Sequence, residues 1–219
     1  EVYQGTLAER VSVPARNLIP KPAELSWAEA ACLPTAWLTA YRMLATRSGL
    51  QPGDTVLVQG AGGGVATACI AIGHALGFRV WATSREESKR ERALSIGADA
   101  VFESGARLPD RVDSVMETVG QATWQHSIRS LRPGGTLVIS GATSGPNPPA
   151  ELAHVFFRQL SVIGSTMGTI EELRALVQLC IRTGLRPLID SARPLGEARS
   201  AFEVMAIGDV FGKLVLTLP

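Results

Sequence analysis

Apolar residues in the middle of the chain gather in short runs, and longer segments with helical spacing of apolar residues separate these runs. The alternation predicts strands at residues 55–59, 79–83, 100–102, 112–117, 136–140 and 161–164, with helices at 64–76, 86–96, 122–131 and 151–158. Strands that alternate with helices predict a parallel sheet with right-handed crossovers. Because the strands are continuously apolar, both faces of the sheet are expected to be covered, as in a doubly wound α/β fold with six strands.

The pattern changes at both ends of the chain. Residues 7–14 alternate between apolar and polar, which predicts a half-buried strand. Ser26 and Glu29 have the spacing of a capping box, which predicts a short helix through residue 31, and a second helix is expected at residues 37–48. After Gly168 we expect a helix at 170–183, a strand near 188–189, a helix at 196–206 and a strand at 213–218. The chain is thus expected to comprise segments 1–34, 35–169 and 170–219.

A glycine-rich turn at residues 60–66 joins the first expected strand to its helix. A helix N-terminus presents unpaired amides to an anion, and glycines let a diphosphate approach the backbone closely. The strand, the turn and the helix therefore predict a Rossmann-type dinucleotide site, although Val65 stands where the third glycine of G-x-G-x-x-G would be. The alternative is a structural turn in an α/β protein that binds another ligand. The residues expected at the pyrophosphate are Gly62, Gly63, Gly64, Val65 and Ala66.

The end of the second expected strand indicates which dinucleotide binds. An NAD site usually has Asp or Glu there, to bind the ribose 2′-hydroxyl. This chain has Ser84 and Arg85, with Lys89 one helical turn further on, and a hydroxyl with two cations suits a 2′-phosphate. We therefore predict NADP(H) rather than NAD(H). The alternative is that these cations are solvated charges paired with Glu86 and Glu87.

Composition narrows the choice of partners and compartment. The 219 residues carry a formal net charge of +1, so no nucleic-acid partner is expected. Hydrophobic residues make up 46% of the chain, which is enough for a packed core. The three cysteines Cys32, Cys69 and Cys180 are widely spaced, and we interpret the last two as buried small side chains in a reducing, cytoplasmic setting. We expect no signal peptide and no membrane span.

Several segments, in order, resemble the medium-chain dehydrogenase/reductase superfamily, the group of quinone oxidoreductases and zinc-type alcohol dehydrogenases. They are residues 33–41 (LPTAWLTAY), 51–58 (QPGDTVLV), 96–99 (IGAD), 131–135 (LRPGG) and 212–216 (GKLVL). The resemblance implies a Rossmann domain inserted into a catalytic domain built on a chaperonin-10-like β-barrel. It also implies that this chain has the Rossmann domain and only remnants of the barrel, because most of the N-terminal part is missing.

The same resemblance bears on metal binding. Zinc-type members would have a cysteine near position 35, where this chain has Thr35. The structural-zinc cysteine cluster is also missing, so we predict no metal site in this chain. His74, His126 and His154 lie on helix patterns without ligand spacing and are interpreted as structural or surface residues.

Further cofactor-binding residues follow from the resemblance, position by position. Thr39 would lie near the nicotinamide, and Lys213 matches a basic position that can reach the cofactor phosphates, although it can equally be a surface lysine. The remaining residues follow the fourth, fifth and sixth strands, where an open α/β sheet binds its ligands. They are Thr118, Val119, Gly141, Ala142, Thr143, Thr166 and Met167.

The implied reaction is hydride transfer between NADP(H) and a carbonyl, an activated alkene, a quinone or an alcohol. No catalytic residue is assigned, since Tyr41 is better explained by packing and Glu117 can be structural. One alternative is an inactive NADP(H)-binding module without its substrate domain. Another is an S-adenosylmethionine methyltransferase, which lacks support because no acidic residue follows the second strand. The apolar residues 155–163 predict a homodimer through the sixth strand.

Overall fold

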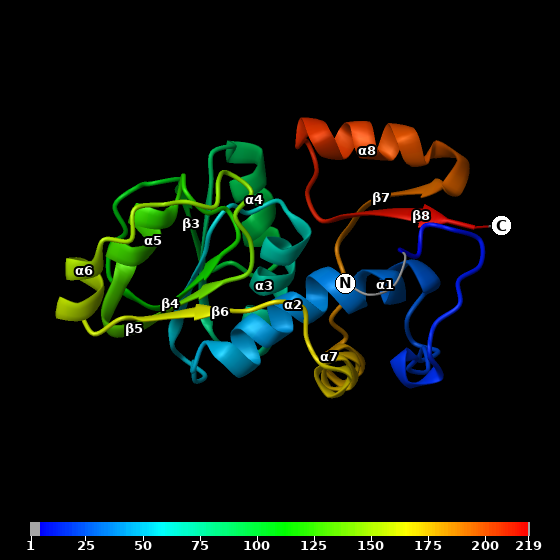
Figure 1. Ribbon diagram of the computed structural model, residues 1–219, viewed down its shortest axis with the longest axis horizontal. Helices are drawn as coiled ribbons and strands as arrows, with labels where there is room; N and C mark the ends of the chain where they lie inside the picture. Colours follow the sequence, from blue (N-terminus) through cyan, green and yellow to red (C-terminus); the bar gives the residue numbers. More distant parts are fainter. Residues whose placement is uncertain (1–4, 219) are drawn as a thin grey trace.

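The computed structural model describes residues 5–218 and contains a six-stranded parallel sheet (Figure 1). Its order is β3-β2-β1-β4-β5-β6, so the strand order reverses between β1 and β4. The strands are β1 Thr55–Val58, β2 Arg79–Ser84, β3 Ala100–Glu103, β4 Val112–Glu117, β5 Leu131–Ile139 and β6 Ser161–Gly164. All five pairings are parallel, which confirms the predicted α/β sheet.

Helices cover both faces of this sheet, and a separate core lies under each face. In β1, Val56 and Val58 belong to one core and Leu57, which points the other way, belongs to the second. This alternation explains why the strands are apolar throughout. The helices that follow the strands are α3 Gly64–Ala75, α4 Glu87–Ser95, α5 Trp124–Ser130 and α6 Leu152–Phe157.

An unbroken helical run precedes the sheet, where two separate helices were expected. It consists of α1 Trp27–Cys32, a π-helical turn at Leu33–Trp37, α2 Leu38–Tyr41 and a second π-helical turn at Arg42–Arg47. Pro34 has no amide hydrogen, and its ring excludes the carbonyl four residues earlier, so the chain widens into a turn in which the Leu38 amide donates to the Leu33 carbonyl. The predicted capping box of Ser26 and Glu29 is confirmed at the N-terminus of α1.

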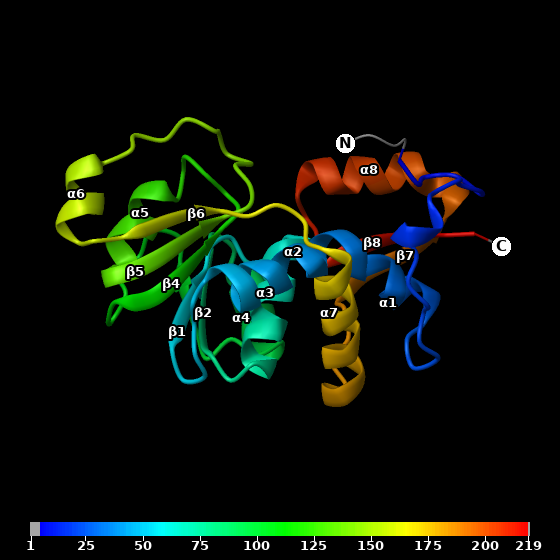
Figure 2. The same ribbon diagram turned by 60° about the horizontal axis from the view of Figure 1, so that its bottom comes forward.

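The C-terminal part forms a second, smaller unit. Helix α7 Ile170–Thr183 leads to β7 Ile189–Pro194, α8 Ala198–Ile207 and β8 Lys213–Thr217, and β7 and β8 pair in parallel. Short 3-10 turns lie at Ala15–Asn17 and Leu195–Glu197. Figures 1 and 2 show the helical run and α7 between the large sheet and the small one.

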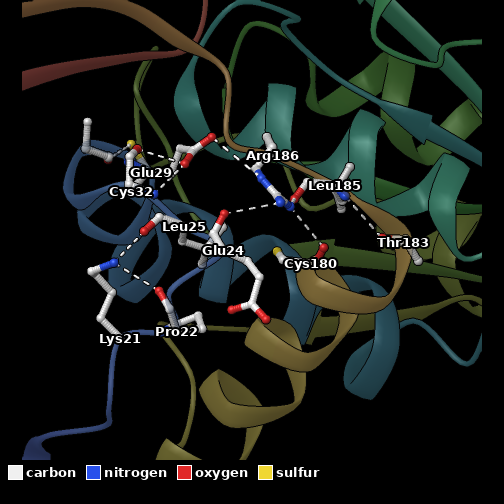
Figure 3. A network of polar contacts seen from close by, with 12 residues as sticks. Lys21, Pro22, Glu24, Leu25, Glu29, Cys32, Cys180, Thr183, Leu185 and Arg186 are labelled. Carbon is white, nitrogen blue, oxygen red and sulfur yellow. Dashed lines mark hydrogen bonds and ion pairs between the residues drawn. The ribbon is translucent and has the colours of Figure 1, made fainter.

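Arg186 fastens the end of α7 to the start of the helical run (Figure 3). Its guanidinium donates to the carbonyls of Cys180, Leu185 and Glu24, at 2.9–3.3 Å, and lies 3.7 Å from the Glu29 carboxylate. The hydrogen bonds from Ser26 and the nearby charge of Arg186 lower the pKa of Glu29. The predicted burial of Cys69 and Cys180 is confirmed.

Some element boundaries differ from the prediction. The strand expected at residues 7–14 is wrong: this segment is irregular, and Leu7 and Val11 are exposed. None of the described strands pairs with the segment. Strand β5 begins at Leu131, whereas the prediction began it at residue 136, because Leu131 pairs with Val112 of β4. The register of the two strands then shifts between Val112 and Ser114. No helix within residues 5–218 combines the length and apolar character that a membrane span requires.

Candidate nucleotide-binding site

The glycine turn lies at the carboxyl end of β1, at the point where the strand order reverses. The Ala61 amide donates to the Thr83 carbonyl at 2.7 Å and the Gly60 amide donates to the Thr83 hydroxyl at 3.3 Å, so the end of β2 supports the turn. Helix α3 starts at Gly64 with Gly63 as its N-cap, and no side chain caps it. A Cβ atom on Gly63 would meet nothing within 4 Å. The backbone at Gly63 is therefore exposed, and a phosphate can approach the N-terminus of the helix at this residue.

Two lysine side chains lie against this turn. A Cβ on Gly64 would be 2.5 Å from Cδ of Lys213, and a Cβ on Gly62 would be 3.0 Å from Cδ of Lys89. Gly62 also has a φ of +140°, which other residues rarely adopt. The structure thus brings Lys89 and Lys213 to the predicted phosphate turn from distant parts of the sequence.

The segment 208–213, which we call the C-terminal strap, is bound to the glycine turn. The Gly212 amide donates to the Gly62 carbonyl at 2.9 Å, and the Lys89 ammonium donates to the Gly208 carbonyl at 2.8 Å. The guanidinium of Arg92 in α4 lies 4.3 Å from the centre of the Phe211 ring. The strap therefore links the small sheet to the turn and fixes the position of Lys213, the first residue of β8.

The end of β2 carries the three residues predicted to bind a 2′-phosphate. Ser84 is buried, and its hydroxyl accepts a hydrogen bond from the Glu86 amide at 3.3 Å, while Arg85 is exposed. The Lys89 ammonium is paired with the Glu86 carboxylate at 2.8 Å, so it is not free in this conformation. Sequence reasoning missed Arg90, which donates to the carbonyls of Ser84 and Arg85 at 2.9 and 3.1 Å and braces the turn after β2.

Beneath the glycine turn, Gln59 is the centre of a buried hydrogen-bond network. Its amide oxygen accepts from the Thr83 hydroxyl at 2.6 Å, and its nitrogen lies 3.0 Å from the Ser127 hydroxyl and 2.8 Å from Nδ1 of His126. His126 Nε2 lies 2.9 Å from the Ala106 carbonyl, which can only accept. Nε2 therefore carries the proton, and Nδ1 accepts from Gln59. These contacts fit the interpretation of His126 as a structural residue rather than a surface residue.

Glu117, at the end of β4, extends this network to the next loop. Its fully buried carboxylate accepts from the amides of Val119 and Gly120, at 2.7 and 3.0 Å, and from the hydroxyls of Thr123 and Ser127. These bonds hold the loop after β4 beside the glycine turn. The two segments are in close contact, because a Cβ atom added to Gly60 would lie 2.7 Å from the Val119 side chain. Glu117 is thus structural.

The loops after β4 and β5 lie against each other. The Thr143 amide donates to the Thr118 carbonyl at 3.4 Å, and the Ser144 amide donates to the Val119 carbonyl at 2.7 Å. A Cβ on Gly141 would be 2.9 Å from the Thr118 carbonyl oxygen. The structure therefore brings together Thr118, Val119, Gly141 and Thr143, with Ala142 between the last two.

The remaining predicted residues lie on the β6 side. Thr39 is buried in α2, whereas Thr166 and Met167 are exposed in the loop after β6, with Met167 at a φ of +48°. A Cβ on Gly168 would be 2.6 Å from Leu38, so this loop passes close beside α2. Among residues 5–218, no three His, Cys, Asp or Glu side chains cluster as metal ligands would.

The strand order, the open glycine turn and the loops at the carboxyl ends define a Rossmann-type nucleotide-binding protein. Residues 64–182, more than half of the chain, match the family described as zinc-binding dehydrogenase. The chain therefore belongs to this family within the medium-chain dehydrogenase/reductase superfamily, which confirms the predicted resemblance. Its homologues are NAD(P)-dependent oxidoreductases.

Three relatives illustrate the similarity. Crotonyl-CoA carboxylase/reductase from Cereibacter sphaeroides is 29% identical over 94% of this chain. The structure of an NAD-dependent alcohol dehydrogenase superposes with a TM-score of 0.90, at 37% identity over 98% of the chain. The 2-octenoyl-CoA carboxylase reductase CinF, in complex with NADP and 2-octenoyl-CoA, superposes at 0.86, with 29% identity over 93% of the chain. The chain spans 56%, 66% and 53% of these three proteins, respectively.

Proposed function

We propose that this chain binds NADP(H) across the carboxyl ends of β1, β2 and β4–β6, and that the protein is an oxidoreductase. It would transfer a hydride between NADP(H) and a carbonyl, an activated alkene, a quinone or an alcohol. The observation that carries the cofactor assignment is the end of β2, where Ser84 and Arg85 stand in place of an acidic residue beside the open glycine turn. An acidic residue there would bind the ribose 2′-hydroxyl and repel a 2′-phosphate.

The relatives support the proposal at a coarser level. CinF was solved with NADP, whereas the similar alcohol dehydrogenase is NAD-dependent. Membership in the family therefore implies a nicotinamide cofactor and leaves the choice between NADP(H) and NAD(H) to local chemistry. Here that chemistry is cationic, because Arg85 is exposed and Arg90 braces the same turn.

Lys89 would have to change partners for the 2′-phosphate to bind it. Its ammonium is now held by Glu86 and by the Gly208 carbonyl. A phosphate carries more negative charge than a carboxylate, so it would compete for the same ammonium. Glu86 is partly exposed and would turn towards solvent. In this proposal Lys89 links the cofactor to the C-terminal strap.

The bound nicotinamide would supply the hydride chemistry, and the residues of this chain would bind and orient the cofactor. The first-turn amides of α3, together with Lys213, would hold the pyrophosphate. Thr39 and the loops after β4, β5 and β6 would surround the nicotinamide end. We assign no catalytic residue within the described part of the chain, since Tyr41 packs against the core.

The cofactor assignment can be tested with the variant Arg85→Glu. We expect a loss of NADPH affinity of about tenfold or more, because a charge-assisted bond is removed and a like charge is introduced, while NADH affinity stays within about twofold. Arg79→Glu is the matched control, since Arg79 is exposed at the opposite end of β2. Equal losses for both cofactors, or no loss for either, would contradict the assignment.

A second candidate function is a cofactor-binding module without turnover. It is favoured by the share of the relatives that this chain spans, 53–66% for the three described above. Steady-state assays of the chain with NADPH and with a quinone, an enone or an aldehyde distinguish the binding module from the oxidoreductase. Binding without oxidation of NADPH supports the module, and turnover supports the enzyme.

We also propose that two copies of the chain pair through β6. This strand is at the edge of the sheet, and Val162 is 42% exposed. Phe156 and Phe157 in the adjacent α6 are exposed as well. An uncovered apolar edge is what one expects where a second strand is to be added.

A further inference from the structure

The crossover from β3 to β4 differs from the other crossovers of the large sheet. Residues 104–111 join these two strands without a helix, whereas α3, α4, α5 and α6 occupy the other four crossovers. Leu108 of this loop packs against the same core as α5. The loop is also fastened to α5, because Nε2 of His126 donates to the Ala106 carbonyl at 2.9 Å. A short loop fills less space than a helix, so it leaves room beside α5.

A hollow of about 470 Å³ lies between this loop and α5. Its walls are residues 105–111 of the loop and His126, Arg129 and Ser130 of the helix. We call it the crossover hollow. Sites for small molecules have volumes of roughly 300–1,000 Å³, so the hollow has the size of such a site.

Positive charge is in excess around the crossover hollow. Arg107, Arg111 and Arg129 line it, and Asp110 is the one acidic residue beside them. Among residues 5–218, neither Arg107 nor Arg111 forms an ion pair, and the Asp110 carboxylate accepts from the Arg111 amide at 2.7 Å. Arg129 is 59% exposed and lies 3.5 Å from the Glu151 carboxylate. The whole chain is nearly balanced in charge, at +1, so this local excess favours an anionic ligand.

The hollow also has an apolar part. Leu108, which is half-buried, and Pro109, which is exposed, line it together with Ala106. A site with several guanidinium groups and an apolar wall suits a ligand that carries both an anionic group and a carbon skeleton.

The crossover hollow is separate from the candidate nucleotide-binding site. None of its lining residues belongs to the glycine turn, to the end of β2 or to the loops after β4, β5 and β6. His126 lies between the two places, since Nδ1 accepts from Gln59, just before the turn, and Nε2 donates to Ala106. Both ring nitrogens are engaged, so His126 is a wall of the hollow. A ligand bound there would leave the nucleotide site free.

We propose that the crossover hollow binds a small phosphorylated molecule. Its phosphate accepts from the guanidinium groups of Arg107 and Arg111, because the planar fork of an arginine matches phosphate oxygens. Arg129 exchanges the Glu151 carboxylate for the same phosphate. The carbon skeleton of the ligand contacts Leu108 and Pro109. A small molecule is favoured over an acidic segment of a protein, because the arginines surround a hollow of limited volume and form no extended surface.

Calorimetric titration with inorganic phosphate and with phenyl phosphate tests the proposal. The wild type should bind phenyl phosphate about threefold or more tightly than inorganic phosphate, because the ring adds apolar contact with Leu108 and Pro109. The double variant Arg107→Ala/Arg111→Ala should bind both probes about tenfold or more weakly, since two charge-assisted hydrogen bonds are lost. Its unfolding midpoint should match that of the wild type, because neither arginine is in an ion pair of the described residues.

Two controls show where the probes bind. Arg47→Ala/Arg182→Ala removes the same charge at exposed positions elsewhere and should leave both affinities within about twofold. Lys213→Ala removes a cation beside the glycine turn and should also leave them unchanged.

Four results would overturn the proposal. They are no binding of either probe to the wild type, equal losses in Arg107→Ala/Arg111→Ala and its charge control, a loss confined to Lys213→Ala, and tighter binding of a glutamate-rich peptide than of phenyl phosphate. Equal affinity of the wild type for the two probes would contradict the contact with Leu108 and Pro109. Each of these results leaves the assignment of NADP(H) to the glycine turn standing, because that site shares no residue with the hollow.

Discussion

At the scale of single residues, the chemistry under the glycine turn depends on side chains that the sequence does not single out. Gln59 immediately precedes the turn, and Thr83 and Ser127 are far from it along the chain. Only folding places them within hydrogen-bond distance. The position of Gln59, a polar residue at the end of an apolar strand, was the one available signal, since a buried amide requires partners.

Glu117 provides a first prediction at this scale. Glu117→Ala leaves two amides and two hydroxyls without their acceptor, so we expect the free energy of unfolding to fall by about 3 kcal/mol or more. Denaturation in urea measures the change. Glu91→Ala is the control, because Glu91 is exposed on α4 and should cost about 0.5 kcal/mol or less. A cost for Glu117→Ala no larger than that of the control would contradict a structural role.

Lys89 illustrates how far a prediction for one residue can reach. Its spacing after β2 predicts a place at the 2′-phosphate, and in the structure its side chain lies beside Gly62 of the glycine turn. It could not reveal that the Gly208 carbonyl, more than a hundred residues away, accepts from the same ammonium. Contacts of that range depend on how the small sheet packs, and no local pattern encodes them.

At the scale of elements, the carboxylate of Glu172 links the start of α7 to the helical run. Glu172 closes a capping box with Thr169 and also accepts from Arg42 and Thr46, each at 2.7 Å. Burial alone would raise the pKa of Glu172, but the hydrogen bonds from Thr169, Thr46 and Arg42 outweigh it and lower the pKa below 4.5. Its ionised form is therefore stabilised by folding.

A pH dependence follows from this shift. A lowered folded-state pKa stabilises the protein fully above the unfolded-state value, and this stabilisation is lost as the pH falls through the folded-state value. Glu172→Gln should lower the free energy of unfolding by about 1–3 kcal/mol at pH 7, and the difference from wild type should shrink below pH 4.5. Denaturation curves across that range measure it, with the exposed Glu171→Gln as control. A difference that stays constant with pH would contradict the assigned cause.

The elements also show which parts of the fold a sequence can predict. The six strands of the large sheet were predictable, because each contains a short apolar run followed by a turn or helix signal. The central strands β1, β2 and β4 are also buried on both faces. The strand expected at residues 7–14 was wrong because alternation shows that one face can be buried but does not supply a partner strand. The break expected before Trp37 was wrong because a π-helical turn lets the helix continue past Pro34.

At the scale of the whole molecule, the exposed edge of the large sheet predicts self-association. We expect a mass of about twice 23.2 kDa in light scattering. Val162→Lys places a charge in the middle of β6 and should shift the chain towards monomer. Glu103→Lys, on the opposite edge strand β3, should leave the mass unchanged. A monomeric wild type, or a dimer that survives Val162→Lys, would contradict pairing through β6.

The central claim is that the glycine turn and the end of β2 form a site for NADP(H). Titration of the chain with NADPH and with NADH tests it most directly, with heat as one readout and tryptophan fluorescence as another, since Trp81 lies in β2. We predict that NADPH binds about ten- to a hundredfold more tightly, the contribution of one or two charge-assisted hydrogen bonds to the 2′-phosphate. Equal affinity, or tighter binding of NADH, would contradict the claim.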